Sequence, residues 1–261
     1  MRRVGPQALA VLAASLLLAS CGGGGKGGGS SKPPQGPPNA RHPASDVAND
    51  LAAEQMRAHL LVAARLYNNG RFAFTTQHMD AAQQDYSKLT NDVRARDAAL
   101  DREFQAAFPV IATQIDQRLP PVGVMNRMGL VQGQLLEAAI SDSMTRPGFK
   151  DPGVTAQVMA QLAEQGAREY ALAAQVGGFT DRGRLAYQNA FGLLTRASSL
   201  SHTISTFLGP QRNAVVNGLN NAHQKGFPTG VLVPRKLDPA AVAAGVAQAR
   251  AGVTQRFGFS A

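Results

Sequence analysis

Apolar residues recur at every third or fourth position through most of the chain after residue 46. The first stripe has spacings of 3, 4, 3 and 4 and consists of Ala53, Met56, Leu60, Ala63 and Tyr67. This period places the side chains on one face of an α-helix. Ser45 and Asp46 are suited to cap the start of that helix. Asn68-Asn69-Gly70 is suited to end it, because Asn and Gly accept the left-handed conformation.

The same period, interrupted by Gly and Pro, predicts further helices. They cover residues 76–108, 122–144, 154–176, 181–208, 211–223 and 239–253. Pro109 is expected to kink or end the second helix, and Pro120-Pro121 marks a boundary. Alternation of apolar and polar residues, which is typical of strands, reaches four residues only at Gly230–Val233. The pattern therefore predicts an all-α fold, a bundle of five to seven helices.

Two of the predicted helices have pronounced apolar faces. Helix 181–208 has a seam at alternating spacings of 4 and 3, made of Ala186, Ala190, Leu193, Ala197, Leu200, Ile204 and Phe207. This seam predicts an antiparallel neighbour, and its alanines would let two backbones approach closely. Helix 122–144 is the most apolar, with Met125, Met128, Val131, Leu135, Ala138 and Ala139. We interpret its methionines as core packing rather than as metal ligands.

Near the N-terminus an apolar run ends at a cysteine. Two arginines precede an uncharged stretch at residues 8–18, and the run closes with Leu18-Ala19-Ser20-Cys21. These are the parts of an export signal, and the run is shorter than the roughly 18–20 residues that a membrane-spanning helix needs. Leu18-Ala19-Ser20-Cys21 resembles the lipobox of bacterial lipoproteins. The alternative is an ordinary secretory signal in which Cys21 is incidental.

The resemblance implies that residues 1–20 are a signal peptide and that Cys21 carries the N-terminal acyl chains, palmitate among them. Cys21 is the one cysteine of the 261 residues. With it acylated, the mature chain has no thiol for catalysis, disulfides or metal ligation. More than one acyl chain holds a protein firmly to a bilayer. Gly22 follows the cysteine where enterobacterial sorting uses Asp for retention in the inner membrane, which favours the periplasmic face of the outer membrane.

The composition after Cys21 predicts a tether followed by a folded domain. Residues 21–45 are rich in Gly, Pro, Ser and Lys with almost no apolar side chains. Such a segment cannot bury enough surface to offset its ordering entropy and is expected to be disordered. Its reach is about 25–30 Å for a flexible chain of this length. Residues 46–261 form the predicted helical domain, with a candidate sub-boundary in the turn-rich stretch 147–153.

Charge is distributed unevenly over the predicted domain. Residues 46–142 contain 12 acidic and nine basic residues, a net charge of −3, whereas residues 143–261 contain five acidic and 12 basic residues, a net charge of +7. A basic half commonly binds polyanions. An exported lipoprotein is not expected to meet nucleic acid, so the polyanions would be lipid headgroups, lipopolysaccharide or peptidoglycan carboxylates. The bases are dispersed along the chain, which also suits general solubility.

No local motif identifies a reaction. The predicted domain has four histidines, His59, His78, His202 and His223, and none has an acidic residue or histidine three or four positions away. The helical arrangements that place two metal ligands on one face are therefore absent, as are the GxSxG and SxxK motifs of serine enzymes. We expect no catalytic residue, no metal site and no cofactor. A site assembled from several helices stays open.

A short stretch is similar to a known class of helical domains. Glu169-Tyr170, Gly177-Gly178-Phe179, Tyr187-Gln188 and Phe191 resemble, within residues 169–191, helical periplasmic domains associated with bacterial iron uptake. Ala186 stands where an acidic residue would be expected beside Tyr187. The resemblance therefore assigns no ligand.

Together the anchor, the tether and the missing catalytic spacings predict a non-enzymatic binding protein. The expected function is a lipid-anchored envelope module that binds a protein partner or an envelope polymer. The alternative is a periplasmic domain that binds a small ligand or a metal.

Overall fold

The computed structural model of the chain describes residues 44–143 and 151–258, with side chains to residue 141 in the first range. These residues belong to one compact unit, residues 36–261. The predicted signal peptide, Cys21 and the tether up to residue 43 lie outside the described residues, as does most of the candidate sub-boundary at 147–153. None of the helices within the described ranges combines the length and apolar character that crossing a membrane requires.

The described residues form helices and no strand. The α-helices are α1 (Ala44–Asn68), α2 (Phe72–Arg96), α3 (Ala98–Asp116), α4 (Pro121–Leu130), α5 (Leu136–Ser143), α6 (Pro152–Val176), α7 (Asp181–Thr203), α8 (Arg212–Gly226) and α9 (Pro239–Phe257). A π-helical segment, η1 (Val131–Leu135), joins α4 to α5, and a 3₁₀ turn, η3 (Gly209–Gln211), precedes α8. The all-α prediction is confirmed.

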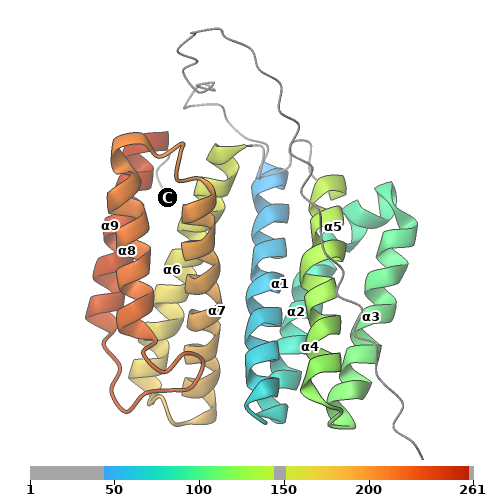
Figure 1. The fold of residues 1–261 in the computed structure, drawn as a ribbon. Helices are drawn as coiled ribbons and strands as arrows, with labels where there is room; N and C mark the ends of the chain where they lie inside the picture. The colour runs from blue at the N-terminus through green and yellow to red at the C-terminus, as the bar shows by residue number, and fades with distance from the viewer. Residues whose placement is uncertain (1–43, 144–150, 259–261) are drawn as a thin grey trace, which may run out of the picture. The chain divides into compact units, whose positions relative to one another are not determined.

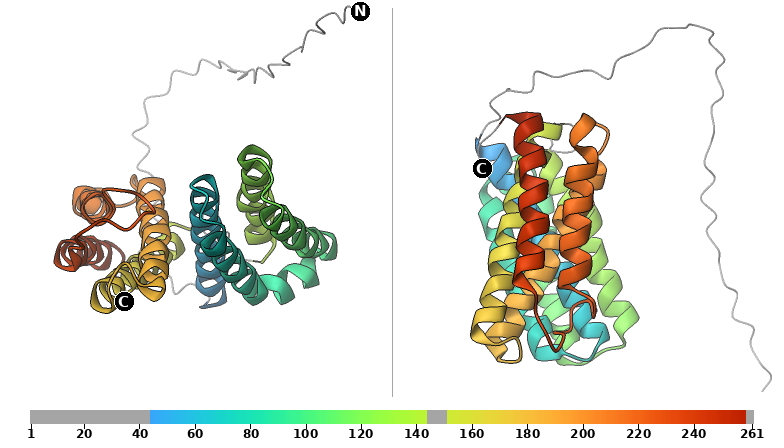
Figure 2. Two further views of the ribbon diagram at one scale, coloured as in Figure 1. Left: turned by 90° about the horizontal axis from the view of Figure 1, so that it is seen from below. Right: turned by 90° about the vertical axis from the view of Figure 1, so that its left-hand side faces the viewer.

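The helices pack in sequential pairs (Figures 1 and 2). α1 packs on α2, α6 on α7, and α8 on α9. α1 also contacts α6 and α7, so the first two of these pairs meet along it, while α9 packs on α6 and α8 on α7. Short turns connect the helices within the first two pairs, which makes the paired helices antiparallel. The four helices α1, α2, α6 and α7 therefore lie side by side.

Apolar burial follows the predicted stripes of α1 and α7 with one exception. The residues of the α1 stripe, Ala53, Met56, Leu60, Ala63 and Tyr67, are buried. The α7 seam is buried from Ala186 to Ile204, but Phe207 is 37% exposed. Its predicted burial is wrong because α7 ends at Thr203 and the chain then turns. Beyond a helix end, a spacing of three no longer keeps side chains on one face.

The helix count is higher than predicted. If α4, η1 and α5 are counted as one continuous helix, the described residues form eight α-helices, not five to seven. The predicted helix 76–108 is two helices, because Asp97 breaks it and caps the second. The Asp97 carboxylate accepts hydrogen bonds from the backbone amides of Ala99 and Leu100, both at 2.9 Å. These bonds satisfy amides that have no partner inside the new helix.

Pro109 does not end a helix. It lies inside α3, which continues to Asp116. A proline removes one backbone hydrogen bond. Phe108, Ile111 and Ile115 are buried on either side of it, and this apolar burial outweighs that loss.

Ser45 and Asp46 also differ from the prediction. They lie within the first turn of α1, which begins at Ala44, so neither precedes the helix as a cap.

The predicted helix 122–144 is continuous over its described part, from α4 through η1 to the end of α5 at Ser143, but η1 changes its buried face. Met128 and Val131 are buried before or at the π segment, and Ala139 is buried after it, whereas Ala138 is exposed. A π segment inserts an extra residue per turn and rotates the residues that follow. The interpretation of Met128 as core packing is confirmed.

Candidate ligand-binding cavity

The four histidines of the helical domain have three different environments. His202 is exposed at the end of α7. His223 on α8 is partly buried, with its Nε2 atom 2.9 Å from Thr195 Oγ1 and its ring against Phe191 and Phe227. His59 on α1 and His78 on α2 lie together in the interior. His59 and His78 form a pair of titratable side chains that no sequence motif indicated.

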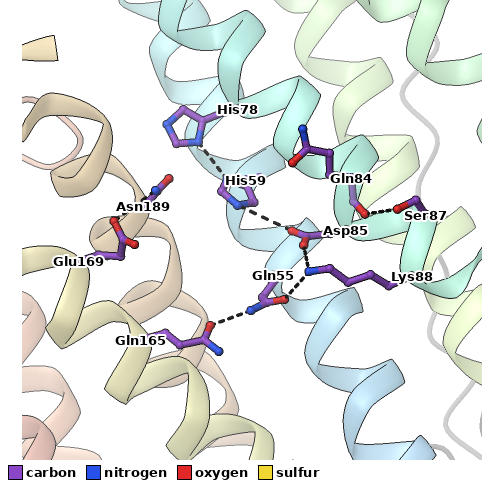
Figure 3. Close-up of polar contacts among 10 residues, drawn as sticks. All are labelled: Gln55, His59, His78, Gln84, Asp85, Ser87, Lys88, Gln165, Glu169 and Asn189. Atoms are coloured by element: carbon purple, nitrogen blue, oxygen red, sulfur yellow. Dashed lines mark hydrogen bonds and ion pairs between the residues drawn. The ribbon is translucent and has the colours of Figure 1, made fainter. Parts of the chain in front are cut away.

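The two imidazoles contact each other directly (Figure 3). Their Nδ1 atoms are 3.0 Å apart, and the second ring nitrogen of His78, Nε2, lies 3.3 Å from Gln188 Oε1 on α7. His78 is fully buried, and the His59 side chain is 18% exposed. Burial disfavours the charged form, which lowers the pKa of His59 and lowers that of His78 to about 3. Both rings are therefore neutral at pH 7.

Asp85 extends this chain of contacts. Its Oδ2 atom is 3.7 Å from His59 Nε2, which is too long for a hydrogen bond. Its Oδ1 atom accepts a hydrogen bond from Lys88 Nζ at 2.6 Å. Lys88 also donates to Gln55 Oε1 at 3.3 Å. Asp85 Oδ2 is buried and has no hydrogen-bond partner among the described residues.

Two acceptors on this wall have no donor. Each neutral imidazole carries one N–H and one bare nitrogen, so only one of the two facing Nδ1 atoms donates to the other. Asp85 Oδ2 and Asn189 Oδ1 are both buried without a hydrogen bond from the described residues. This wall of the site is therefore short of hydrogen-bond donors.

A cavity of about 300 Å³ opens at this wall, between the α1–α2 and α6–α7 pairs. Apart from Leu193, its lining residues are polar: Gln55, His59, Asp85, Lys88, Gln165, Arg168, Glu169 and Asn189. Figure 3 shows Asn189 and Glu169 reaching from α7 and α6 toward the histidine pair. Asn189 Nδ2 donates to Glu169 Oε2 at 3.4 Å, while Asn189 Oδ1 is buried without a partner among the described residues.

Sequence reasoning missed the cavity because its residues are far apart along the chain. His59 and His78 are 19 positions apart, and Gln55 and Gln165 are 110 apart, yet Gln55 Nε2 donates to Gln165 Oε1 at 2.7 Å. The turn at residues 69–71 folds α2 back on α1 and brings the histidines to the same level. One signal was available: His59 and His78 lie at similar distances on either side of a predicted helix end at Asn68-Asn69-Gly70.

A second buried charged cluster links α1 to α7. Glu54 accepts from Arg57 at 2.5 Å and from Arg196 Nε at 2.7 Å, and its side chain is 2% exposed. Asp50 lies one turn away on α1. Burial, the larger cause, and the negative charge of Glu54, the next, raise the pKa of Asp50 to about 7. Arg57 on α1 and Arg196 on α7 balance the charge of Glu54, and the Arg196 ion pair connects the two helices.

The cavity lining limits the chemistry that it can support. It contains no serine, threonine or cysteine, the usual nucleophiles. No three histidine, cysteine, aspartate or glutamate side chains within the described ranges are placed to hold a metal ion. What the cavity does contain is bare acceptors on its walls and two flexible bases. That arrangement is suited to reversible binding of a polar molecule.

Comparison with protein-family models, curated proteins and solved structures found no match. The residues similar to helical iron-uptake domains divide between the cavity and the core. Glu169 lines the cavity, whereas Tyr170 and Tyr187 are buried beside Phe227, with ring centroids 5.4 and 5.1 Å from it. The two tyrosines therefore pack in the interior instead of facing the cavity.

Proposed function

We propose that this protein is a lipid-anchored, non-enzymatic binding module of the bacterial cell envelope, and that the cavity is its site for a small polar ligand. The observation that carries the proposal is the donor shortage at the cavity wall. Asp85 Oδ2 and Asn189 Oδ1 are buried without hydrogen bonds from the described residues. Leaving such groups unpaired costs about 1–3 kcal/mol each. A ligand that donates to them recovers that free energy on binding.

The location in the envelope rests on the N-terminal sequence. Leu18-Ala19-Ser20-Cys21 supports cleavage before Cys21 and acylation of it, and Gly22 supports the outer membrane. Residues 21–45 would then carry the domain on a tether at the periplasmic face. A binding module held at a membrane in this way works on molecules that pass through the periplasm.

The binding function is tested by a thermal-shift screen of the mature protein against small polar compounds of several classes: amino acids, sugars, organic acids and phosphates. A ligand of the cavity should raise the melting temperature of the wild type by mass action. Asn189→Leu, which replaces one unpaired oxygen by apolar carbon, should remove that shift. Gln224→Leu, an exposed change on α8 away from the cavity, is the matched control and should keep it. If no class of compound shifts the wild type, the proposal fails.

A second candidate function is binding of an anionic envelope polymer, and a specific surface favours it. A pocket of about 340 Å³ is lined by Arg71, Phe74, Phe179, Arg184, Gln188, Leu232 and Val233. Phe179 is 58% exposed and Leu232 is 38% exposed, which is unusual for side chains of this size. Two arginines beside exposed apolar groups are suited to a polymer that carries carboxylates.

The polymer function is tested by cosedimentation with purified peptidoglycan. Phe179→Ser together with Arg71→Gln should reduce the bound fraction without lowering the melting temperature, because both side chains are exposed. Val122→Ser with Arg127→Gln on α4 is the matched control, since it changes the same residue classes at another exposed place. Equal sedimentation of the wild type and both variants would rule out this surface.

A further inference from the structure

The charges that line the cavity are balanced. Asp85 and Glu169 are acidic, and Lys88 and Arg168 are basic. His59 adds no charge at neutral pH, because burial lowers its pKa. A ligand with a net charge would repel one of these pairs. A neutral molecule with separated positive and negative groups matches both pairs.

The acidic and basic side chains lie at different depths. The Asp85 side chain is 8% exposed, whereas Lys88 is 55% exposed and Arg168 is 69% exposed. The buried carboxylate therefore sits at the inner wall and the two bases lie at the mouth. A ligand that follows this order places its positive group inward and its negative group outward.

The inner wall needs donors and offers no place for another acceptor. The unpaired acceptor atoms are Asp85 Oδ2 and Asn189 Oδ1. A primary ammonium carries three N–H donors and no acceptor. Its donors therefore complement this wall, whereas a hydroxyl or a carboxylate would bring at least as many acceptors as donors.

Lys88, which extends from the mouth, already places one ammonium group against Asp85. Its Nζ atom lies 2.6 Å from Asp85 Oδ1 and 3.3 Å from Gln55 Oε1. Both partners line the cavity. Because Lys88 is largely exposed, its side chain can move to let a second ammonium reach the other oxygen of Asp85.

We infer that the cavity binds a free α-amino acid, with the ammonium against Asp85 and Asn189 and the carboxylate against Arg168 at the mouth. This inference rests on the proposed function, since it names the ligand class of the same cavity. A volume of about 300 Å³ is at the lower end of ligand pockets, which is appropriate for a molecule of this size.

The test is isothermal titration calorimetry of the purified mature protein with the twenty common L-amino acids. The strongest ligand is then compared with its N-acetyl derivative, which lacks the ammonium, and its methyl ester, which lacks the carboxylate. We expect at least a tenfold loss of affinity for the N-acetyl derivative and a smaller loss for the ester, because Arg168 is exposed and screened by solvent.

Two variants report on the inner wall. Asp85→Asn keeps the shape of the side chain and removes its charge, and it should weaken binding of the amino acid about tenfold or more. Asn189→Leu should weaken binding too, without altering any charge. Asp101→Asn is the matched control, because Asp101 is also buried and paired with a base, Arg94, but lies outside the cavity. It should bind as the wild type does.

The outcomes separate the ligand class from the binding function. If the N-acetyl derivative, or a sugar from the thermal-shift screen, binds as well as the amino acid and remains sensitive to Asn189→Leu, the amino-acid assignment is overturned and the cavity remains a binding site. If no amino acid binds while another class of compound does, the amino-acid assignment is likewise overturned and the cavity remains a binding site. If no compound of any class binds, both proposals fall. Binding that survives both inner-wall variants places the amino acid elsewhere and also overturns the inference.

Discussion

At the scale of single residues, burial moves the pKa values of Asp50 and His78 in opposite directions. It raises the pKa of the Asp50 carboxyl to about 7 and lowers that of the His78 imidazole to about 3. The physical cause is the same, since a low dielectric disfavours the charged form of either group. Both residues are therefore neutral at mildly acidic pH in the folded protein. The pH dependence of stability therefore has opposite signs for the two groups. Asp50 makes the free energy of unfolding fall as pH rises, and His78 makes it rise.

Asp50→Asn should change how stability depends on pH. In the wild type the folded pKa of Asp50, about 7, is above its ordinary value of 3.8. The stabilisation that this provides is present below about pH 4 and is lost as pH rises through 7. Asparagine does not titrate, so the free energy of unfolding of the variant, relative to the wild type, should increase between about pH 5 and pH 8. Urea denaturation at several pH values measures it.

The exposed Asp80→Asn is the control for removing one acidic residue. Its free energy of unfolding should run parallel to that of the wild type over the same pH range. Parallel curves for Asp50→Asn as well would show that the Asp50 carboxyl is already ionised in the folded protein at pH 5, against the expected result.

At the scale of helices, two glycines decide how closely α8 and α9 approach. A β-carbon on Gly245 would lie 2.5 Å from the backbone oxygen of Gly218 and 2.9 Å from the Ala222 Cβ atom. A β-carbon on Gly218 would lie 2.7 Å from the backbone oxygen of Gly245. These are backbone contacts that cannot yield without moving a helix. The absence of two side chains therefore sets the spacing of this pair.

Gly245→Ala should destabilise the protein by about 1–3 kcal/mol, because overpacking outweighs the better helix propensity of alanine. Gly129→Ala is the matched control in α4, where a β-carbon would meet nothing within 4 Å. That change should stabilise the protein by up to about 1 kcal/mol. Both are measured as denaturant midpoints. A stabilising Gly245→Ala would mean that α8 and α9 are further apart than in this structure.

The buried seam of α7 gives a second prediction at this scale. Leu200 is 8% exposed and Ser201 beside it is fully buried, whereas His202 is exposed. Leu200→Ala should cost about 2–5 kcal/mol, near the lower end because the site is at the edge of the core. His202→Ala should change stability by less than roughly 0.5 kcal/mol. A neutral Leu200→Ala would show that this part of the seam is a surface.

At the scale of the whole molecule, the proposed anchor and the helical domain are separate parts with separate tests. Cys21→Ser should abolish acylation and leave an unprocessed or mislocalised precursor, because the thioether bond to the lipid requires the sulfur. Labelled palmitate and membrane fractionation measure this. Labelled lipid at the wild-type level in the variant would contradict it. The helical content of the purified variant by circular dichroism should equal that of the wild type, since Cys21 lies outside the helices described.

The sequence by itself determined the helices and much of their buried face. A period of 3.6 residues is a local property, so the stripe from Ala53 to Tyr67 and the seam from Ala186 to Ile204 could be predicted from spacing alone. Local reasoning failed where two local signals competed. Asp97 acts as a cap inside an apparently continuous helix, and Pro109 is tolerated within one because burial around it is stronger than its cost.

The cavity was decided only by the tertiary structure. Its unpaired acceptors come from α2 and α7, and their significance lies in distances between helices, which no spacing along the chain encodes. An oxygen of a buried aspartate is hydrogen-bonded only if the packing of the helices places a donor atom within about 3 Å of it. The sequence shows that Asp85 and Asn189 are polar. Packing four helices around them is what leaves their acceptor atoms unpaired, and an unpaired buried acceptor is the physical basis for expecting a ligand.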